Sequence, residues 1–589
     1  MTRTRLRLKA RLRLARIRYT LSAMRISEVT RGIILAILVG LASGIGAVIF
    51  KWLIGWVHTI FFTGGGIAFS FIGSYYVLLI PAIGGLAVGL LIRFLTGKAK
   101  GHGVSEVMIA VNARGGRIAH WSAAVQTVAS AVCIGSGGSV GLHGPAVYLG
   151  SALGSALGQL GRMRENWVKL LVACGAAGGI SATFNAPIAG IFFALELILR
   201  RLSARNFILV GLSSVGASYV ARFFFEGSPI FSHVPGYAWT SGWEILFYVM
   251  LGIVSAFVGV SFVLLLYRCE DIFGAWKFPS FLKPAVGGLF IGLIGLFYPY
   301  LFGIGYEGAE LAILGSFGAA TLVIMGLLKV FATSVTLGSG GRGGIFAPSL
   351  FMGAMLGTAF GMGIHTAFPT LAPNPGAYGL VGMGAVFATV SFAPITAILI
   401  LFEITRDYLI ILPLIAAVVS STYIAQRIKR DSVYSMKVRR QGVEIMEGEL
   451  DPLRNNTVGG IMTRNFPTVQ REMPMKELLH EMERTGHHGF PVVDTDGRLF
   501  GVVTLSDVER AIGAGTANLK VQDIATRNPV TAYPDEKVRT VLTRFATMEV
   551  GRIPVVSRND PTLLLGCLRR HDIIRSYTKA LLARREDEL

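Results

Sequence analysis

Two glycine-rich segments carry the residues best suited to hold a ligand. Residues 135–145 read GSGGSVGLHGP, residues 338–348 read GSGGRGGIFAP, and the two align without a gap. Glycine allows positive φ and leaves backbone N–H groups unshielded. A helix that starts directly after such a loop adds free N–H groups and the positive end of its dipole. These features predict an anion site that needs no full positive charge. The alternative is that the glycines only permit close helix packing.

A second duplication follows each of these segments. The sequence API at 186–188 precedes Glu196, and API at 393–395 precedes Glu403 at the same spacing. The chain therefore has two homologous halves, at about 31–220 and 240–436. Transporters built from two repeats often bind their substrate at the repeat interface, on helices broken near the bilayer midplane. The sequence alone leaves open whether the halves run parallel or inverted.

The composition indicates which elements position these loops. Hydrophobic residues make up 52% of the 589 residues and charged residues only 15%, too few for a water-soluble surface. Apolar stretches at 32–51, 75–92, 245–266 and 385–402 are long enough to cross a hydrocarbon core of ~30 Å. The sequence predicts an all-α integral membrane domain at 31–436, with helices broken by Gly and Pro.

The net charge of +21 is concentrated before the first apolar stretch. Nine basic residues and no acidic residue precede Glu28: Arg3, Arg5, Arg7, Lys9, Arg11, Arg13, Arg16, Arg18 and Arg25. This is typical of a positive-inside segment, so we expect residues 1–30 to form a cytosolic arm beside anionic lipid. Nucleic acid is not expected as a partner, and no cleavable signal peptide is predicted.

The chemistry of enzymes and metal sites is not indicated. The four cysteines are scattered without metal-ligand spacing, so neither a zinc site nor a disulfide framework is expected. No catalytic triad and no Walker-type phosphate loop is recognisable, so we expect no enzymatic activity.

The pattern changes after residue 436. A charged linker at 437–452 leads to short apolar strands that alternate with amphipathic helices. The plan occurs twice, at 453–515 and 516–589, which predicts a soluble α/β tail of two copies. The tail shares the arm's side of the membrane if the number of crossings is even.

Several motifs together resemble the CLC family of chloride channels and chloride/proton exchangers. Residues 101–106 (GHGVSE) stand where the family has GSGIPE, 141–145 (GLHGP) where it has GREGP, and 344–348 (GIFAP) where it has GxFxP. Residues 184–187 match FNAP, and Tyr434 matches the tyrosine that closes the inner end of the anion path. The resemblance covers nearly the whole chain.

This resemblance implies a multi-pass protein of the cell membrane, a homodimer with one anion path per subunit and two inverted halves, and a cytosolic arm and tail. It implies that chloride is held by the amides of Ile345 and Phe346 and the hydroxyl of Tyr434. The expected anion-path residues are Gly101, His102, Gly103, Ser105, Gly141, Leu142, His143, Gly144, Pro145, Gly344, Ile345, Phe346, Ala347, Pro348 and Tyr434.

Two departures from the family pattern concern protons. His143 replaces the glutamate of GREGP, which gates the anion path and carries the proton in exchangers. Leu197 replaces the inner proton-relay glutamate and cannot titrate, and Glu196 beside it is expected to cap or pack a helix. The resemblance therefore favours a passive chloride channel. The alternatives are an exchanger in which His143 accepts the proton and, more remotely, a cation transporter with a regulatory tail.

His143 has two interpretations. Either the imidazole only fills the gap and leaves the path open, or it forms a proton-sensitive gate, because histidine titrates near neutral pH. Our hypothesis is that lower pH increases the current. His102 replaces a serine that contacts the central anion, which leaves the selectivity among chloride, bromide, nitrate and fluoride open.

The tail resembles a tandem CBS pair. Residues 501–507 (GVVTLSD) match the family's GhxTxxD, in which Thr504 and Asp507 would hold ribose hydroxyls. The second copy keeps Asp572 but has Arg569 in place of the threonine. The resemblance implies one adenine nucleotide (ATP, ADP or AMP) per tail, as a regulator that transport does not require. The alternative is a nucleotide-free dimerisation scaffold.

Overall fold

The computed structural model describes residues 28–96, 103–225, 231, 242–370, 374–443, 456–514, 519–548 and 550–588. The chain divides into two compact units, Met1–Gly448 and Glu449–Leu589. Most of the predicted arm, most of the linker, and the predicted site residues Gly101 and His102 lie outside the described residues.

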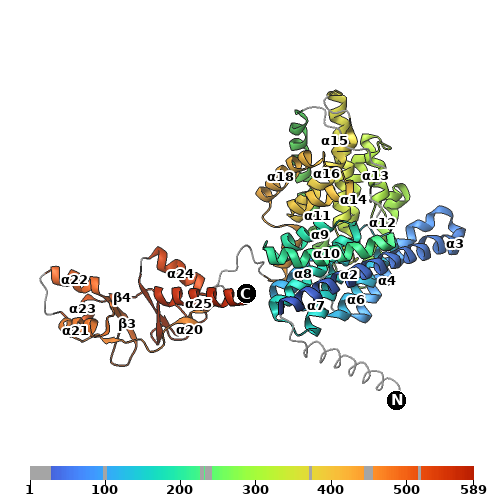
Figure 1. The fold of residues 1–589 in the computed structure, drawn as a ribbon. Helices are drawn as coiled ribbons and strands as arrows, with labels where there is room; N and C mark the ends of the chain where they lie inside the picture. The colour runs from blue at the N-terminus through green and yellow to red at the C-terminus, as the bar shows by residue number, and fades with distance from the viewer. Residues whose placement is uncertain are drawn as a thin grey trace, which may run out of the picture. The chain divides into compact units, whose positions relative to one another are not determined.

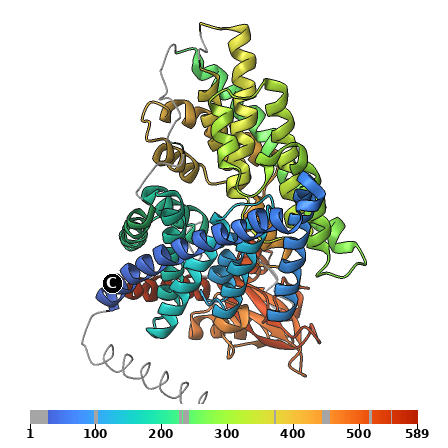
Figure 2. The ribbon, with the colours of Figure 1, turned by 90° about the vertical axis from the view of Figure 1, so that its right-hand side faces the viewer.

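The first unit is helical throughout its described residues (Figures 1 and 2). The first half contains α2 (Glu28–His58), η1 (Thr59–Gly64), α3 (Gly65–Ala68), η2 (Ser70–Tyr75), α4 (Tyr76–Leu95), α5 (Val104–Ala113), α6 (His120–Gly135), α7 (His143–Leu160), α8 (Glu165–Phe184), α9 (Pro187–Phe193), its π-helical continuation η3 (Ala194–Leu199) and α10 (Ala204–Phe225). The second half contains α11 (Glu244–Ala275), α12 (Lys283–Phe297), η4 (Pro299–Leu301), α13 (Tyr306–Ile313), α14 (Ala319–Gly338), α15 (Phe346–Ala367), α16 (Pro375–Ser391), α17 (Pro394–Thr405), α18 (Ile411–Ile428) and α19 (Val433–Arg440).

Helix length and hydropathy confirm the membrane domain. Among the described residues, eight helices are long and apolar enough to cross a bilayer. The predicted spans at 32–51, 75–92 and 245–266 fall on α2, α4 and α11. The predicted span at 385–402 is wrong, because α16 ends at Ser391 and α17 starts at Pro394. Proline lacks the N–H and the conformational freedom that would let α16 continue.

Glycine contacts between α4 and α12 relate the two halves. A Cβ on Gly85 would lie 2.1 Å from the carbonyl oxygen of Pro284, and a Cβ on Gly288 would lie 2.0 Å from that of Pro81. Pro81 and Pro284, like Gly85 and Gly288, are 203 residues apart, the same offset as the two glycine-rich segments. Exchanging the two halves therefore converts one contact into the other, as a two-fold axis between the halves requires.

The pair of acidic residues after the API motifs fixes the direction of the halves. The Glu196 carboxylate, at the end of α9–η3, accepts hydrogen bonds from the amides of Ile395 (3.2 Å) and Thr396 (2.8 Å) at the start of α17. The Glu403 carboxylate, near the end of α17, accepts from the amides of Ile188 (3.0 Å) and Ala189 (2.7 Å) at the start of α9. Equivalent helices therefore run antiparallel, which confirms the inverted repeat, and the predicted capping role of Glu196 is confirmed.

The described part of the second unit contains two small β-sheets and several helices. One sheet has the order β1 (Val469–Gln470), β2 (Gly489–Val493), β3 (Leu499–Thr504), β4 (Thr526–Arg527), and the other pairs β5 (Arg552–Val556) with β6 (Leu564–Arg569). The helices are α20 (Val458–Ile461), α21 (Met475–Thr485), α22 (Leu505–Gly513), α23 (Val521–Ile524), α24 (Val538–Thr547) and α25 (Arg570–Glu588). Each copy lends its opening residues to the other, because Thr526 pairs with Val502 and Thr463 pairs with Cys567.

Candidate functional site

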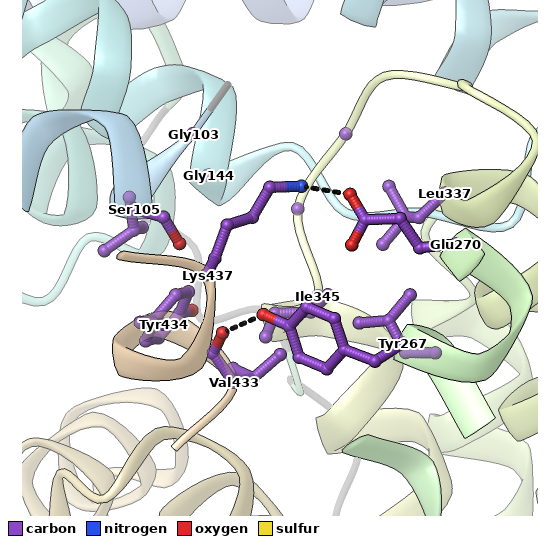
Figure 3. Close-up of a pocket in the computed structure, with 14 residues that line it drawn as sticks. Gly103, Ser105, Gly144, Tyr267, Glu270, Leu337, Ile345, Val433, Tyr434 and Lys437 are labelled. Atoms are coloured by element: carbon purple, nitrogen blue, oxygen red, sulfur yellow. Dashed lines mark hydrogen bonds and ion pairs between the residues drawn. The ribbon is translucent and has the colours of Figure 1, made fainter. Parts of the chain in front are cut away.

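A cavity of about 60 Å³ lies where both halves meet (Figure 3). This volume is several times the roughly 10–15 Å³ that one water molecule needs on the same measure. It is lined by Gly103, Val104, Ser105, Gly144, Leu266, Tyr267, Glu270, Leu337, Gly343, Gly344, Ile345, Val433, Tyr434 and Lys437. Six of the predicted anion-path residues are in this set: Gly103, Ser105, Gly144, Gly344, Ile345 and Tyr434.

Four helices begin at the cavity wall. The first residues of α5 and α19 line it, as do Gly144 at the start of α7 and Ile345, the residue before α15. The first amides of a helix lack intrahelical acceptors and carry the positive end of the dipole. Helix starts from both halves, with their partial positive charges, therefore lie at the cavity wall.

The two glycine-rich loops bond to each other at the centre of the unit. The amide of Gly141 donates to the carbonyl oxygen of Gly344 at 2.7 Å, and the amide of Gly344 donates to that of Gly141 at 2.7 Å. A Cβ on Gly344 would lie 2.7 Å from the backbone nitrogen of Gly144. The glycines thus let the two helix starts approach closely, so the packing interpretation and the anion-site interpretation describe the same loops.

The starts of α7 and α15 have the same pattern of backbone hydrogen bonds. The first amide-to-carbonyl bond of α7 runs from Ala146 to Leu142 at 3.1 Å, and that of α15 runs from Ser349 to Ile345 at 3.0 Å. Amides before Ala146 and Ser349 precede these bonds. They include the predicted donors of Ile345 and Phe346.

The imidazole of His143 is fully buried beside this site, although His143 is not among the cavity-lining residues. Its ring stacks on Phe184 at 3.6 Å between centroids, with Nε2 bonded to the Tyr306 hydroxyl and Nδ1 2.9 Å from Thr183 Oγ1. The Thr183 hydroxyl donates its proton to the carbonyl oxygen of Gly179 at 2.8 Å. Each ring nitrogen of His143 therefore has a hydroxyl group as its hydrogen-bond partner, and each hydroxyl can donate or accept.

The position of the inner proton relay is apolar. Leu197 lies in the π-helix η3 and is 5% exposed, packed in the main hydrophobic core. Glu196 beside it has its carboxylate on α17, where Thr396 donates from both its amide and its hydroxyl. π-Helical turns often mark functional positions. Here the turn contains both the capping carboxylate of Glu196 and the buried Leu197.

Comparison with known proteins identifies the family. The model of the family "Voltage gated chloride channel" matches residues 84–426, more than half of the chain. The chain belongs to this family, the CLC proteins. The CBS domain model matches twice, at 458–514 and 521–579.

Individual CLC relatives include both transport types. The chain is 30% identical over 567 residues to the chloride channel protein CLC-e of Arabidopsis thaliana, covering 82% of this chain and 78% of the relative. It is 32% identical over 440 residues to the H⁺/Cl⁻ exchange transporter ClcA of Vibrio cholerae, covering 72% and 92%. The crystal structure of a slow cyanobacterial Cl⁻/H⁺ antiporter matches 70% of this chain and 98% of its own, with a TM-score of 0.64 and 24% identity, and shows the shared CLC fold.

One part of the cavity wall of this CLC protein was missed from the sequence. Lys437, the first residue of the predicted linker, lies inside α19, and its Nζ is 3.0 Å from Glu270 Oε1 on α11. The nearby Tyr267 hydroxyl donates to the carbonyl oxygen of Val433 at 2.5 Å (Figure 3). The charged end of α11 was the only sequence signal for this wall.

The predicted nucleotide residues lie in the second unit and differ between the copies. Thr504 donates from its amide (2.9 Å) and hydroxyl (2.7 Å) to the Asp507 carboxylate, forming a capping box at the start of α22. The exposed Arg510 adds only a longer contact to Asp507, at 3.4 Å. In the other copy the Arg569 guanidinium binds both Asp572 carboxylate oxygens, at 3.0 and 2.8 Å. Asp572 is thus neutralised at close range from within the chain, whereas the closest partners of Asp507 are uncharged.

Proposed function

We propose that this CLC protein conducts chloride passively through the cavity between α5, α7, α15 and α19, without coupled movement of protons. The observation that carries the proposal is the pair of substitutions along the expected proton route. Leu197 has no titratable group, and His143 replaces the gating carboxylate. We place the protein in the cell membrane as a homodimer, with the arm and the tail in the cytosol.

The surroundings of these two residues support the proposal. His143 already uses both ring nitrogens, one toward Thr183 and one toward Tyr306. In a protonated imidazole both ring nitrogens donate, so both hydroxyls would have to act as acceptors. Glu196, the nearest acid in sequence to the relay position, is engaged by α17. A proton route through these residues therefore lacks a second titratable group.

The alternative is an exchanger in which His143 carries the proton, and the names of the ClcA relative and of the antiporter structure favour it. Purified protein in liposomes with an imposed chloride gradient separates the two. We expect chloride flux with no uphill proton movement. Uphill movement at a fixed proton-to-chloride ratio overturns the channel proposal. The variant L197E with H143E, which restores both carboxylates, is the matched positive control.

We also propose that the tail binds one adenine nucleotide at Thr504 and Asp507. The capping box gives the carboxylate of Asp507 the neutral groups of Thr504 as its closest partners, consistent with a site for ribose hydroxyls. Thermal unfolding of the full-length protein with and without ATP, AMP or ADP tests this, because a ligand of the folded state raises the transition temperature. We expect a shift in wild type that D507N removes. No shift with any of the three supports the nucleotide-free scaffold.

A further inference from the structure

Among the fourteen residues that line the cavity, Lys437 is the sole base and Glu270 the sole acid. The other lining residues are apolar, glycine, serine or tyrosine. The two charges come from different elements, α19 and α11, and their side chains are 24% and 39% exposed. Both side chains line the cavity, are partly exposed and form an ion pair with each other (Figure 3).

We propose that Lys437 and Glu270 form a charge-balancing pair that sets how readily anions reach the cavity. The inference rests on the proposed anion conduction at this site and names a determinant of anion access that the two glycine-rich loops do not contain. Alone, the Glu270 carboxylate repels an anion from the mouth. With the Lys437 ammonium 3.0 Å away, the wall is locally neutral and the helix N-termini dominate the potential.

Other contacts besides this pair hold α19 against α11. The Tyr267 hydroxyl holds the Val433 carbonyl at 2.5 Å in a buried bond. The guanidinium of Arg440 binds both oxygens of Asp271, at 2.7 and 3.1 Å, and lies 4.6 Å above the Tyr267 ring. Part-exposed ion pairs contribute little to stability by themselves. The role proposed for Lys437 and Glu270 is therefore electrostatic: the pair sets the potential that an anion meets at the cavity.

The pair also suits passage better than a lone lysine would. A single fixed cation at the mouth binds an anion tightly and releases it slowly, whereas conduction needs both entry and exit. Glu270 offsets the excess attraction of Lys437. Loss of Lys437 is therefore expected to impair transport through weak anion binding. Loss of Glu270 is expected to impair it through slow anion release.

The test is chloride flux into proteoliposomes, measured as initial rate against chloride concentration for K437Q, E270Q and the double variant. We expect K437Q to raise the half-saturating chloride concentration roughly tenfold, as an uncompensated unit charge near the path would. E270Q lowers both the half-saturating concentration and the maximal rate. The double variant and K437R return close to wild type, and R427Q, which removes an exposed charge on α18 that does not line the cavity, leaves the half-saturating concentration unchanged.

Two outcomes overturn the inference. A double variant as impaired as K437Q means that Lys437 only holds the structure, and K437Q indistinguishable from wild type means that the pair has no part in access. Failure of the channel proposal is separate, because uphill proton movement by wild type changes the transport class while the chloride dependence of these variants still decides the role of the pair.

Discussion

The two halves of the membrane unit use the same backbone at the candidate anion site and different side chains. In both, a glycine-rich loop ends in a helix whose first residue is buried and aromatic or heteroaromatic: His143 begins α7 and Phe346 begins α15. Phe346 packs on Phe387 at 3.8 Å between centroids, whereas His143 forms hydrogen bonds through both ring nitrogens. Duplication supplied the amides that favour an anion, and the divergence of one side chain supplied the candidate gate.

A second difference lies downstream. From Pro187 to the left-handed Arg200 the first half has one residue more than the second half has from Pro394 to the left-handed Arg406. The extra residue is absorbed in the π-helical turn η3, while α17 stays α-helical. The proton-relay position thus falls on a stretch where the halves differ in backbone as well as in side chain.

The largest effect is expected where the halves touch. In G344A the new Cβ lies 2.7 Å from the backbone nitrogen of Gly144 and must push the loops apart. Overpacking of this kind costs about 1–3 kcal/mol, and displaced amides should reduce chloride flux at least about tenfold. Thermal unfolding in detergent and liposome flux measure both. G363A in α15, the helix that follows this loop, is the matched control because a Cβ there meets open space, and equal behaviour of the two variants would contradict the close approach.

Removal of the two capping carboxylates, Glu196 and Glu403, should destabilise the protein by unequal amounts. E196A removes three hydrogen bonds and E403A two, because α17 offers the Thr396 hydroxyl where α9 offers Ala189. Bonds to a charged group contribute about 1.5–3 kcal/mol each at most, so both variants should lower the free energy of unfolding, with E196A the worse. In a T396A background the two losses should become equal. A larger loss for E403A would contradict this comparison.

Replacing the candidate gate makes the two helix starts alike. Chloride flux through wild type should rise towards the acidic end of the range from pH 8 to pH 5, because a protonated imidazole attracts anions. In H143F the flux should be independent of pH over that range. H120Q removes an exposed histidine at the start of α6 and should keep the wild-type profile. A wild-type chloride flux that does not change with pH would indicate that His143 only fills space in the anion path.

The smallest effect concerns the other duplicated region, the tail. R569T gives the second copy the threonine that the first copy has and frees Asp572 from its bidentate partner. Nucleotide bound per chain should rise from about one to about two by equilibrium dialysis of full-length protein. A stoichiometry that stays at one would show that Arg569 is not what closes the second copy.

Features that occur twice in the chain could be predicted from the sequence. The two loops and the two acidic caps were visible because equal spacing in two segments rarely arises without duplication, and the fold followed from them. Contacts between unlike residues were not visible. Lys437 and Glu270 lie 167 residues apart and share no motif, so their pairing follows only from how α19 packs on α11. The break at Phe392 was missed because the residues around it are as apolar as a continuous span.

The bond between Gly141 and Gly344 has a consequence for biosynthesis. The first loop leaves the ribosome about 200 residues before its partner, so neither can adopt its final backbone until most of the membrane domain has been made. Contacts so distant in sequence form slowly. The transport site should therefore be the last part of this domain to mature, and a chain that stalls between the halves would carry an apolar, half-built face into the bilayer, exposed to quality control.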